Sequence, residues 1–294
     1  MTKISTLKIN CTSIASLISS SQGNNSPTEK QWRDFFNLVN KPIEKLTSKQ
    51  MYDIKNIVLK QIDYSPEDLS ETIIKEMCQI YAQEMYGKFT LSGGGLKPHA
   101  LDKGALAEDN AIAFISKIDK VRYEKNEKVV SNAYFKGKPD ILITVGSRLK
   151  DIVGLKEVKV PYDYPSFLRL YEEPMSKQNS WQMQGYMDIL KLDESELIHC
   201  LVDMPDSMIE ARLDDLSERC FILGIPDEEI KQRCEFIRSN MVYDNIPDEL
   251  KIIRVTVQKN SVRIKEAKAR VRLARKWLSE LHNKIEKSVA LAQN

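Results

Sequence analysis

The strongest constraint on the fold of this chain is a pair of short apolar segments near its middle. They cover residues 139–145 and 152–160 and consist largely of Val, Ile and Leu. Continuous apolar runs of this length, rich in β-branched residues, are typical of strands that are buried on both faces of a sheet. Because only a short connection separates them, the sequence predicts two neighbouring strands in the core of a mixed α/β fold.

Charged residues interrupt these two runs at positions with a defined geometry. Side chains alternate along a strand, so Glu157 and Lys159 share one face, whereas Val158 points to the other. Asp140, in the first run, would then lie near Glu157 on the adjacent strand. Two carboxylates in a partly desolvated cleft repel each other unless a proton or a cation lies between them. Hard divalent cations that prefer oxygen ligands, Mg²⁺ or Mn²⁺, suit this position.

The lysine beside these carboxylates has a chemical use. It can hold or deprotonate an attacking water molecule and balance the charge that builds on a phosphate in the transition state. A Glu-x-Lys triplet by itself is common, and the ordinary alternative is an ion pair at the end of a strand. The catalytic interpretation is favoured here because other polar residues with defined spacings surround the triplet.

A helix predicted over residues 103–118 puts Glu108 on its apolar side. Glu108 lies in one stripe with Ala111, Ile112 and Ile115, at the i, i+3, i+4 and i+7 positions of a helix. A glutamate that faces the core needs a partner inside the fold. The alternative is a carboxylate in the first turn that is stabilised by the helix dipole.

A second predicted helix carries Gln182 and Tyr186 one turn apart. Both lie on the side of the helix that continues to Ile189, so their polar ends need hydrogen-bonding partners inside the fold. The alternative for Tyr186 is a core tyrosine with its hydroxyl at the rim. A further strand at residues 197–202 completes the order strand, strand, helix, strand, and His199 within it is expected to be structural.

These residues together resemble the PD-(D/E)xK nuclease superfamily, in particular the branch of lambda-type (YqaJ-like) recombination exonucleases and RecB-like nuclease domains. The resemblance rests on the Pro-Asp pair at 139–140, the Glu-Val-Lys triplet at 157–159 and the Gln-x-x-x-Tyr motif at 182–186. It covers about residues 100–205. It implies a restriction-endonuclease-like core, with a small mixed central sheet flanked by helices and with N- and C-terminal helical additions.

The resemblance also implies a function and a role for each motif residue. The implied activity is that of a metal-dependent DNA exonuclease, which hydrolyses phosphodiester bonds in phage or prophage recombination or in DNA processing. The implied ion is Mg²⁺, with Mn²⁺ as a substitute. Lys159 would support the attacking water, and Gln182 and Tyr186 would position the site. The implied metal ligands are Glu108, Asp140, Glu157 and the backbone carbonyl of Val158.

Two other functions fit the same residues. A PD-(D/E)xK endonuclease, such as a junction resolvase or a restriction-like defence enzyme, shares the chemistry, because end recognition is set by oligomer shape and not by the catalytic strand. A catalytically silent DNA-binding module on the same fold is the other alternative. It is disfavoured because every motif position is filled by a competent residue.

Charge is distributed unevenly along the chain, although its formal net charge is only +2. Residues 206–229 carry eight acidic side chains and two basic ones, whereas residues 259–276 carry eight basic and one acidic. A charge run on a helix is usually a solvated face, and the alternative is contact with DNA phosphates. The candidates for DNA contact are Arg263, Lys265, Lys268, Arg270, Arg272 and Arg275, together with Lys136 and Lys138 beside Asp140.

The C-terminal region also predicts a long helix with an apolar seam. The seam needs a partner, which is either the chain's own domain or a second copy of the chain. Small alanines in the seam favour close packing on the chain's own domain. The seam residues are Ile264, Ala267, Val271, Ala274, Leu278, Leu281 and Ile285.

The sequence contains no internal repeat and no clear linker, which predicts one domain with helical additions. The expected regions are an N-terminal helical region at 1–90 that packs on the core, the PD-(D/E)xK nuclease core at 91–205, and a C-terminal helical region at 206–294 with one added strand and a long basic terminal helix. DNA is the implied partner, and a homo-oligomer and a single-strand annealing protein are further options.

The remaining expectations concern what the chain lacks. No apolar run approaches the ~18 residues needed to cross a bilayer, and a signal segment is missing. We therefore expect no membrane association and a location in the cytoplasm of a bacterial or phage-infected cell. The five cysteines lack the spacing of metal-binding pairs, so reduced thiols and no iron–sulfur cluster are expected.

Overall fold

The computed structural model describes residues 6–19, 29–62, 69, 71–88, 99–146, 148 and 151–292. The chain forms two compact units, one of residues 1–89 with 262–294 and one of residues 90–261. All the predicted metal ligands belong to the second unit. The predicted division into three regions stays a prediction.

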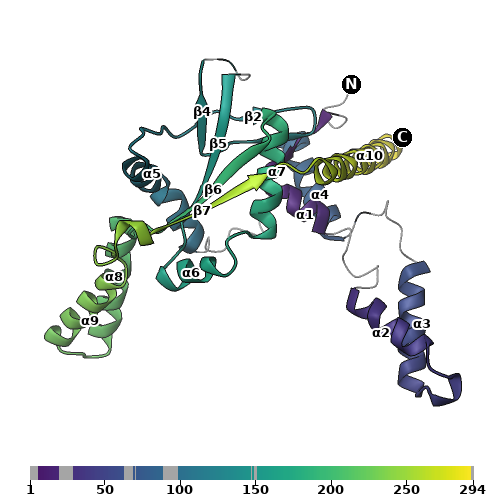
Figure 1. The fold of residues 1–294 in the computed structure, drawn as a ribbon, viewed down its shortest axis with the longest axis horizontal. Coiled ribbons are helices and arrows are strands. Elements are labelled where there is room, and N and C mark those ends of the chain that lie inside the picture. Colours follow the sequence, from purple (N-terminus) through teal and green to yellow (C-terminus); the bar gives the residue numbers. More distant parts are fainter. Residues whose placement is uncertain are drawn as a thin grey trace. The chain divides into compact units, whose positions relative to one another are not determined.

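The unit of residues 90–261 is built around a sheet with the strand order β4-β5-β6-β7 in the described part of the chain (Figure 1). Strand β5 pairs antiparallel with β4 and parallel with β6, and β7 pairs antiparallel with β6. The sheet is therefore mixed, as predicted. The strands are β4 (Ile141–Thr144), β5 (Ile152–Lys159), β6 (Glu194–Cys200) and β7 (Ile252–Gln258).

Helices cover both faces of this sheet. On one face, Ala111 and Ile115 of α5 (His99–Asp119) pack in a buried apolar cluster with Val158 and Ile198. The opposite face contacts α7 (Lys177–Leu190), which crosses over from β5 to the parallel strand β6. Ser176 caps the start of α7, because its side chain accepts a hydrogen bond from the backbone N–H of Asn179.

The smaller elements of this unit surround the sheet. A short antiparallel pair, β2 (Val130–Ser131) and β3 (Phe135–Gly137), precedes β4, and α6 (Tyr164–Leu168) follows β5. Two antiparallel helices, α8 (Asp206–Ile222) and α9 (Asp227–Ser239), form a helical hairpin between β6 and β7. Pro205 and Pro226 precede these helices, and acidic side chains follow in both first turns, where the helix dipole favours them.

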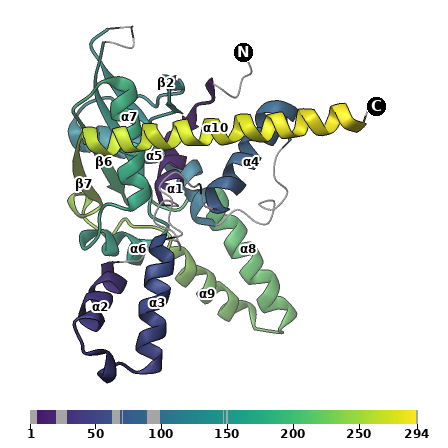
Figure 2. The same ribbon diagram turned by 90° about the vertical axis from the view of Figure 1, so that its right-hand side faces the viewer.

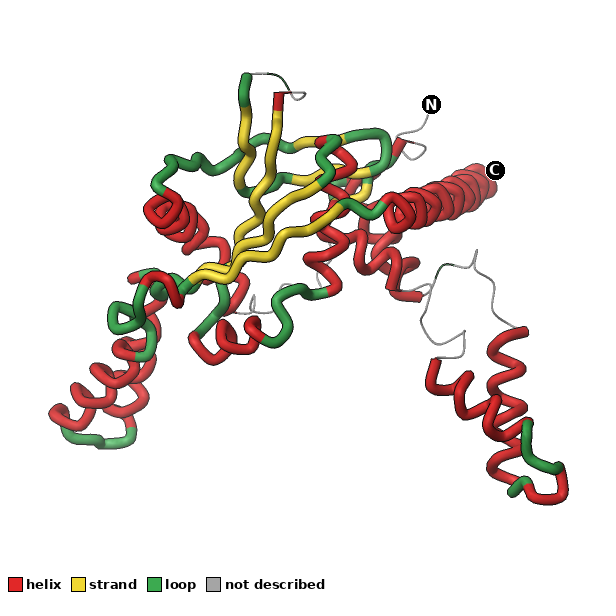
Figure 3. The backbone as a smooth tube through the Cα atoms, viewed as in Figure 1, coloured by secondary structure: helices red, strands yellow, loops and turns green. Residues whose placement is uncertain are grey.

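The prediction that both central strands are buried on both faces is wrong for their outer halves. Ile143 is 36% exposed, Val145 77% and Val153 54%. Strand β4 lies at the edge of the sheet, and Figure 3 shows this end of the β4–β5 hairpin extending past the neighbouring helices. An apolar, β-branched run specifies a strand, but it does not specify how far the helices cover that strand.

The unit of residues 1–89 and 262–294 is helical. Its long helix α10 (Ser261–Ala292) is continuous (Figure 2), and its seam residues Val271, Ala274 and Leu278 are buried within this chain. Tyr81 and His282 form a side-chain hydrogen bond of 2.9 Å between α4 and α10. The predicted packing of the seam on the chain itself is therefore confirmed. The other elements are β1 (Ile9–Asn10), α1 (Ile14–Ser19), α2 (Glu29–Val39), α3 (Ser48–Ile62) and α4 (Glu71–Tyr86).

In the part of the chain that the structure describes, no helix has both the length and the apolar character that a membrane span requires.

Candidate active site

Strand β5 places Glu157 and Lys159 on one face, as the alternation of side chains predicts. Glu157 is 2% exposed. Its Oε1 atom accepts hydrogen bonds from Lys159 Nζ at 2.6 Å and from Gln182 Nε2 at 2.7 Å. Its Oε2 atom is buried and has no hydrogen-bond partner among the residues that the structure describes. One carboxylate oxygen is thus held by two side chains, whereas the other is buried without a donor from the described residues.

Asp140 joins the site from the chain that enters β4. It lies immediately before Ile141, outside the strand in which it was predicted. The reason is local, because the backbone carbonyl of Asp140 accepts a hydrogen bond from the N–H of Asn126 at 2.8 Å, while its Oδ2 atom accepts one from the N–H of Val158 at 2.7 Å. The predicted proximity of Asp140 to the Glu157 strand is nevertheless present, and the Val158 backbone lies beside it.

Burial is the largest single influence on the pKa of each of these three groups. Burial, together with the negative charge of Glu157, raises the pKa of Asp140 to about 7, although Lys159 and the Val158 N–H oppose this shift. Burial also raises the pKa of Glu157, against the opposing effect of Lys159. Burial alone would lower the pKa of Lys159, but the charges of Glu157 and Asp140 outweigh it and raise this pKa. The lysine is therefore positively charged, and the raised pKa values of the two carboxyl groups mean that this environment disfavours two uncompensated negative charges.

Helix α5 adds Glu108 to the same cluster. Its negative charge contributes to the raised pKa values of Asp140 and Glu157. Its Oε1 atom is buried and has no hydrogen-bond partner within the described ranges of the chain, whereas Oε2 lies 3.5 Å from Lys125 Nζ. Sequence reasoning missed Lys125, because its position depends on how the loop after α5 folds back and no spacing indicates this.

Helix α7 supplies the supporting polar residues. Gln182 is 4% exposed, and its Nε2 atom donates to Glu157 and also to the Tyr186 hydroxyl at 3.1 Å. The Tyr186 hydroxyl donates in turn to the backbone carbonyl of Lys138 at 3.3 Å. Both side chains face the core, as predicted, and they connect Glu157 to the chain that leads into Asp140.

The donor atoms of this cluster suit a hard cation. Two buried carboxylate oxygens, Glu108 Oε1 and Glu157 Oε2, receive no hydrogen bond from any part of the chain that the structure describes, and oxygen ligands of this kind are those that Mg²⁺ and Mn²⁺ prefer. Among the described residues, however, no three His, Cys, Asp or Glu side chains are grouped closely enough to hold a metal by themselves. A bound ion would therefore also need the Val158 carbonyl or water, and the metal site stays a prediction.

The residues proposed from the sequence for DNA contact differ in accessibility. Lys265 and Arg272 are exposed, and Lys136, Arg263 and Lys268 are half-buried. Lys138 forms an ion pair of 3.0 Å with Glu127. Arg270 is buried, and Arg275 donates two hydrogen bonds to the carbonyl oxygen of Leu7, at 2.8 and 2.6 Å. The charge run on α10 is thus partly used in packing, and DNA contact stays a prediction for these residues.

His199 has the structural role that was expected of it. Its Nε2 atom lies 2.6 Å from the carbonyl oxygen of Pro174, and burial lowers its pKa. This contact holds the segment before α7 against β6.

Comparison with known proteins supports the fold. No protein-family model matches the sequence, and neither does any curated protein. A phage-related exonuclease from Haemophilus somnus 129PT has a similar structure, with a TM-score of 0.58 and 18% identity over 95% of this chain and 96% of that one. An alkaline exonuclease from Laribacter hongkongensis gives a TM-score of 0.50 and 14% identity over 76% of this chain and 88% of that one. The chain therefore has the mixed α/β fold of these exonuclease structures, as its resemblance to the lambda-type exonuclease branch predicts.

Proposed function

We propose that this chain is a metal-dependent DNA exonuclease that hydrolyses phosphodiester bonds in phage or prophage recombination or in DNA processing. The state of Glu157 carries this proposal. An ordinary ion pair at a strand end is solvated, whereas Glu157 is 2% exposed and one of its oxygens has no hydrogen-bond partner in the described part of the chain. A charged group in this environment needs a further partner, and the cluster contains more carboxylates than cations. The shared fold with two exonuclease structures supports the same conclusion.

The residues of the cluster divide into ligands and supporting groups. Glu108, Asp140, Glu157 and the carbonyl oxygen of Val158 would hold the ion. Mg²⁺ bound there would supply Lewis-acid activation and charge compensation for the phosphodiester. Lys159 is charged, so it can bind the attacking water and compensate the negative charge that develops on the phosphate.

Gln182 and Tyr186 act as positioning residues in this scheme. Gln182 donates to the same Glu157 oxygen as Lys159, which leaves the other oxygen directed to a ligand. Tyr186 contacts Gln182 and therefore restricts its side-chain conformation. A site held in this way loses little further conformational entropy when substrate binds.

Digestion of three forms of one DNA tests the proposal. Linear, nicked and closed-circular DNA are incubated with the full chain in Mg²⁺ and in chelator. We expect degradation of the linear form alone, in Mg²⁺ alone. Glu157→Gln should abolish the degradation, whereas Glu228→Gln on the exposed surface of α9 should not change it.

Each other outcome identifies an alternative. Cleavage of the closed circle would establish an endonuclease of the resolvase or restriction type. Binding of DNA without cleavage would indicate a catalytically silent module. Cleavage at full rate in chelator would contradict the metal-dependent chemistry.

A further inference from the structure

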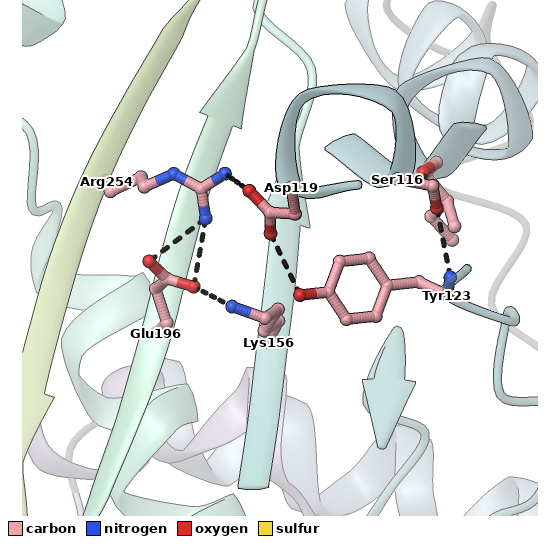
Figure 4. Close-up of polar contacts among 7 residues, drawn as sticks. Ser116, Asp119, Tyr123, Lys156, Glu196 and Arg254 are labelled. Carbon is pink, nitrogen blue, oxygen red and sulfur yellow. Dashed lines mark hydrogen bonds and ion pairs between the residues drawn. The ribbon is translucent and has the colours of Figure 1, made fainter. Parts of the chain in front are cut away.

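The loop that follows α5 is fixed at its start by a polar network. The backbone N–H of Tyr123 donates to Ser116 Oγ at 3.1 Å, and its hydroxyl donates to Asp119 Oδ2 at 2.9 Å. Asp119 in turn accepts from Arg254 of β7 at 2.5 Å. Lys156 of β5 lies 5.4 Å from the centre of the Tyr123 ring. Figure 4 shows this network, which holds the end of α5 against the sheet.

The same loop is fixed at its other end beside Asp140. The backbone N–H of Asn126 donates to the carbonyl of Asp140 at 2.8 Å, and its side chain donates to the carbonyl of Pro139 at 2.8 Å. Lys125 forms an isolated antiparallel bridge with Ile141. Hydrogen bonds therefore hold the loop on both sides of Lys125, and these contacts restrict the position of its backbone.

The side chain of Lys125 extends from this position to α5. Its Nζ atom lies 3.0 Å from Asp109 Oδ1 and 3.5 Å from Glu108 Oε2, and the side chain is 25% exposed. The side chain of Glu108 is 21% exposed, and its Oε1 atom has no hydrogen-bond partner among the described residues. Glu108 thus repeats the pattern of Glu157, in which a lysine contacts one oxygen and no described residue donates to the other.

We infer that Lys125 is the resident counter-ion of Glu108 and that it weakens the binding of a divalent cation at the site. This inference rests on the proposed function. In the metal-free protein, Lys125 compensates a carboxylate that lies within electrostatic reach of Asp140 and Glu157. When a cation binds to Glu108, two positive charges share one carboxylate and repel each other.

An opposite effect has to be weighed against this repulsion. Lys125 also orients Glu108, and removing it would release that side chain. Loss of a partly exposed ion pair of this kind would change the equilibrium constant for metal binding by at most about fivefold. Repulsion between a unit charge and a divalent ion around one carboxylate lowers the binding constant of that ion by about tenfold or more, even with the screening of bulk water. Repulsion therefore dominates, and removal of Lys125 should strengthen metal binding.

Asp109 explains why Lys125 need not move when the cation binds. It is the nearer of the two carboxylates that contact the ammonium group, and its side chain is 75% exposed. Lys125 can keep this partner while Glu108 takes the cation. Lys125 is therefore a fixed positive charge that lowers the affinity of the site for a divalent cation.

The test measures metal binding directly, without DNA. Binding of Mn²⁺ to the full chain is followed by electron paramagnetic resonance, and thermal unfolding is recorded in chelator. Lys125→Met should bind Mn²⁺ about tenfold more tightly and should unfold at a lower temperature in chelator. Lys125→Gln is measured in parallel because its amide can still hydrogen-bond to Glu108, and it should also bind Mn²⁺ more tightly.

Two control variants separate charge from general effects. Lys125→Arg keeps the positive charge and should retain the Mn²⁺ affinity of the unaltered chain. Lys117→Met removes another ion pair of the same helix, between Lys117 and Asp248, and should leave the affinity unchanged. In a Glu108→Gln background, the gain from Lys125→Met should shrink, because the two residues act through one contact.

The outcomes distinguish this inference from the proposed function. If the unaltered chain binds Mn²⁺ but Lys125→Met and Lys125→Gln bind it equally or less tightly, the counter-ion role is wrong and the nuclease proposal stands. An undiminished gain in the Glu108→Gln background also overturns the counter-ion role. If the unaltered chain binds no Mn²⁺, both proposals fail.

Discussion

At the scale of single residues, Asp140 links pH to the proposed metal site. Burial and the charge of Glu157 raise its pKa to about 7, from an ordinary value of 3.8. Between these two values Asp140 is protonated in the folded metal-free protein and ionised in the unfolded chain. The folded state therefore binds more protons, so the contribution of this residue to stability is full at low pH and is lost as pH rises to about 7.

This linkage predicts two pH effects of opposite sign. In chelator, the melting temperature of the unaltered chain relative to Asp140→Asn should fall as pH rises from about 4 to about 7 and then level off, because the proton is lost over that range. Mg²⁺ binding should strengthen over the same range, because the proton no longer competes with the cation. Thermal unfolding at several pH values measures both effects. A difference between the two proteins that stays constant with pH would contradict the raised pKa.

At the scale of elements, the register of β5 decides which of its side chains lie in the carboxylate cluster. Lys159 faces Glu157, whereas Lys156 lies on the opposite face, where it pairs with Glu196 and contacts the Tyr123 ring. The same strand therefore carries one lysine with a proposed chemical role and another with a structural role.

These two lysines provide a matched pair of variants. Lys159→Ala should lower turnover by about 100-fold, because the ammonium group that binds the water and compensates the charge of the transition state is lost, with little change in fold. Lys156→Ala should lower the melting temperature, because it leaves Glu196 without one cation, but should retain turnover at temperatures where the protein is folded. Steady-state kinetics and thermal unfolding separate the two effects. Equal losses of turnover would show that the faces of β5 do not divide these functions.

The sequence predicted the elements better than their surroundings. Alternation along β5 and the spacing of Gln182 and Tyr186 depend on local geometry alone, and the structure confirms both. The exposure of β4 depends instead on the reach of distant helices, and the contact of Lys125 with Glu108 depends on a loop that folds back. Such features arise from tertiary packing, so a single sequence contains no periodic signal for them.

At the scale of the whole molecule, charge is separated between elements. The acidic run of residues 206–229 forms α8 and the start of α9, whereas the basic run of residues 259–276 lies mainly in α10. The sequence indicated both runs, but only the structure shows that Arg270 is buried and that Arg275 bonds to a backbone carbonyl. Fewer basic side chains of α10 are therefore accessible than the count from the sequence suggests.

The more accessible basic residues of α10 are the ones to test for DNA contact. Replacing Lys265, Lys268 and Arg272 with Gln should weaken DNA binding and reduce the slope of log affinity against log salt by roughly 0.9 for each lost phosphate contact. Binding isotherms at several salt concentrations measure this slope. The matched control replaces Lys231, Arg233 and Arg238 of the acidic hairpin with Gln and should leave the slope unchanged. Equal slopes for the unaltered chain and the α10 variant would contradict DNA contact and show that the charge run is a solvated face.

The division of the chain has a consequence for its synthesis. Residues 90–261 are continuous in sequence, so this unit can fold as soon as it leaves the ribosome. The other unit combines residues 1–89 with 262–294, and its buried residues include Met77 of α4 and Leu278 of α10. Residues 1–89 are synthesised before α10, so the core of this unit is incomplete until α10 has been made. During that interval its apolar side chains are accessible to chaperones and proteases.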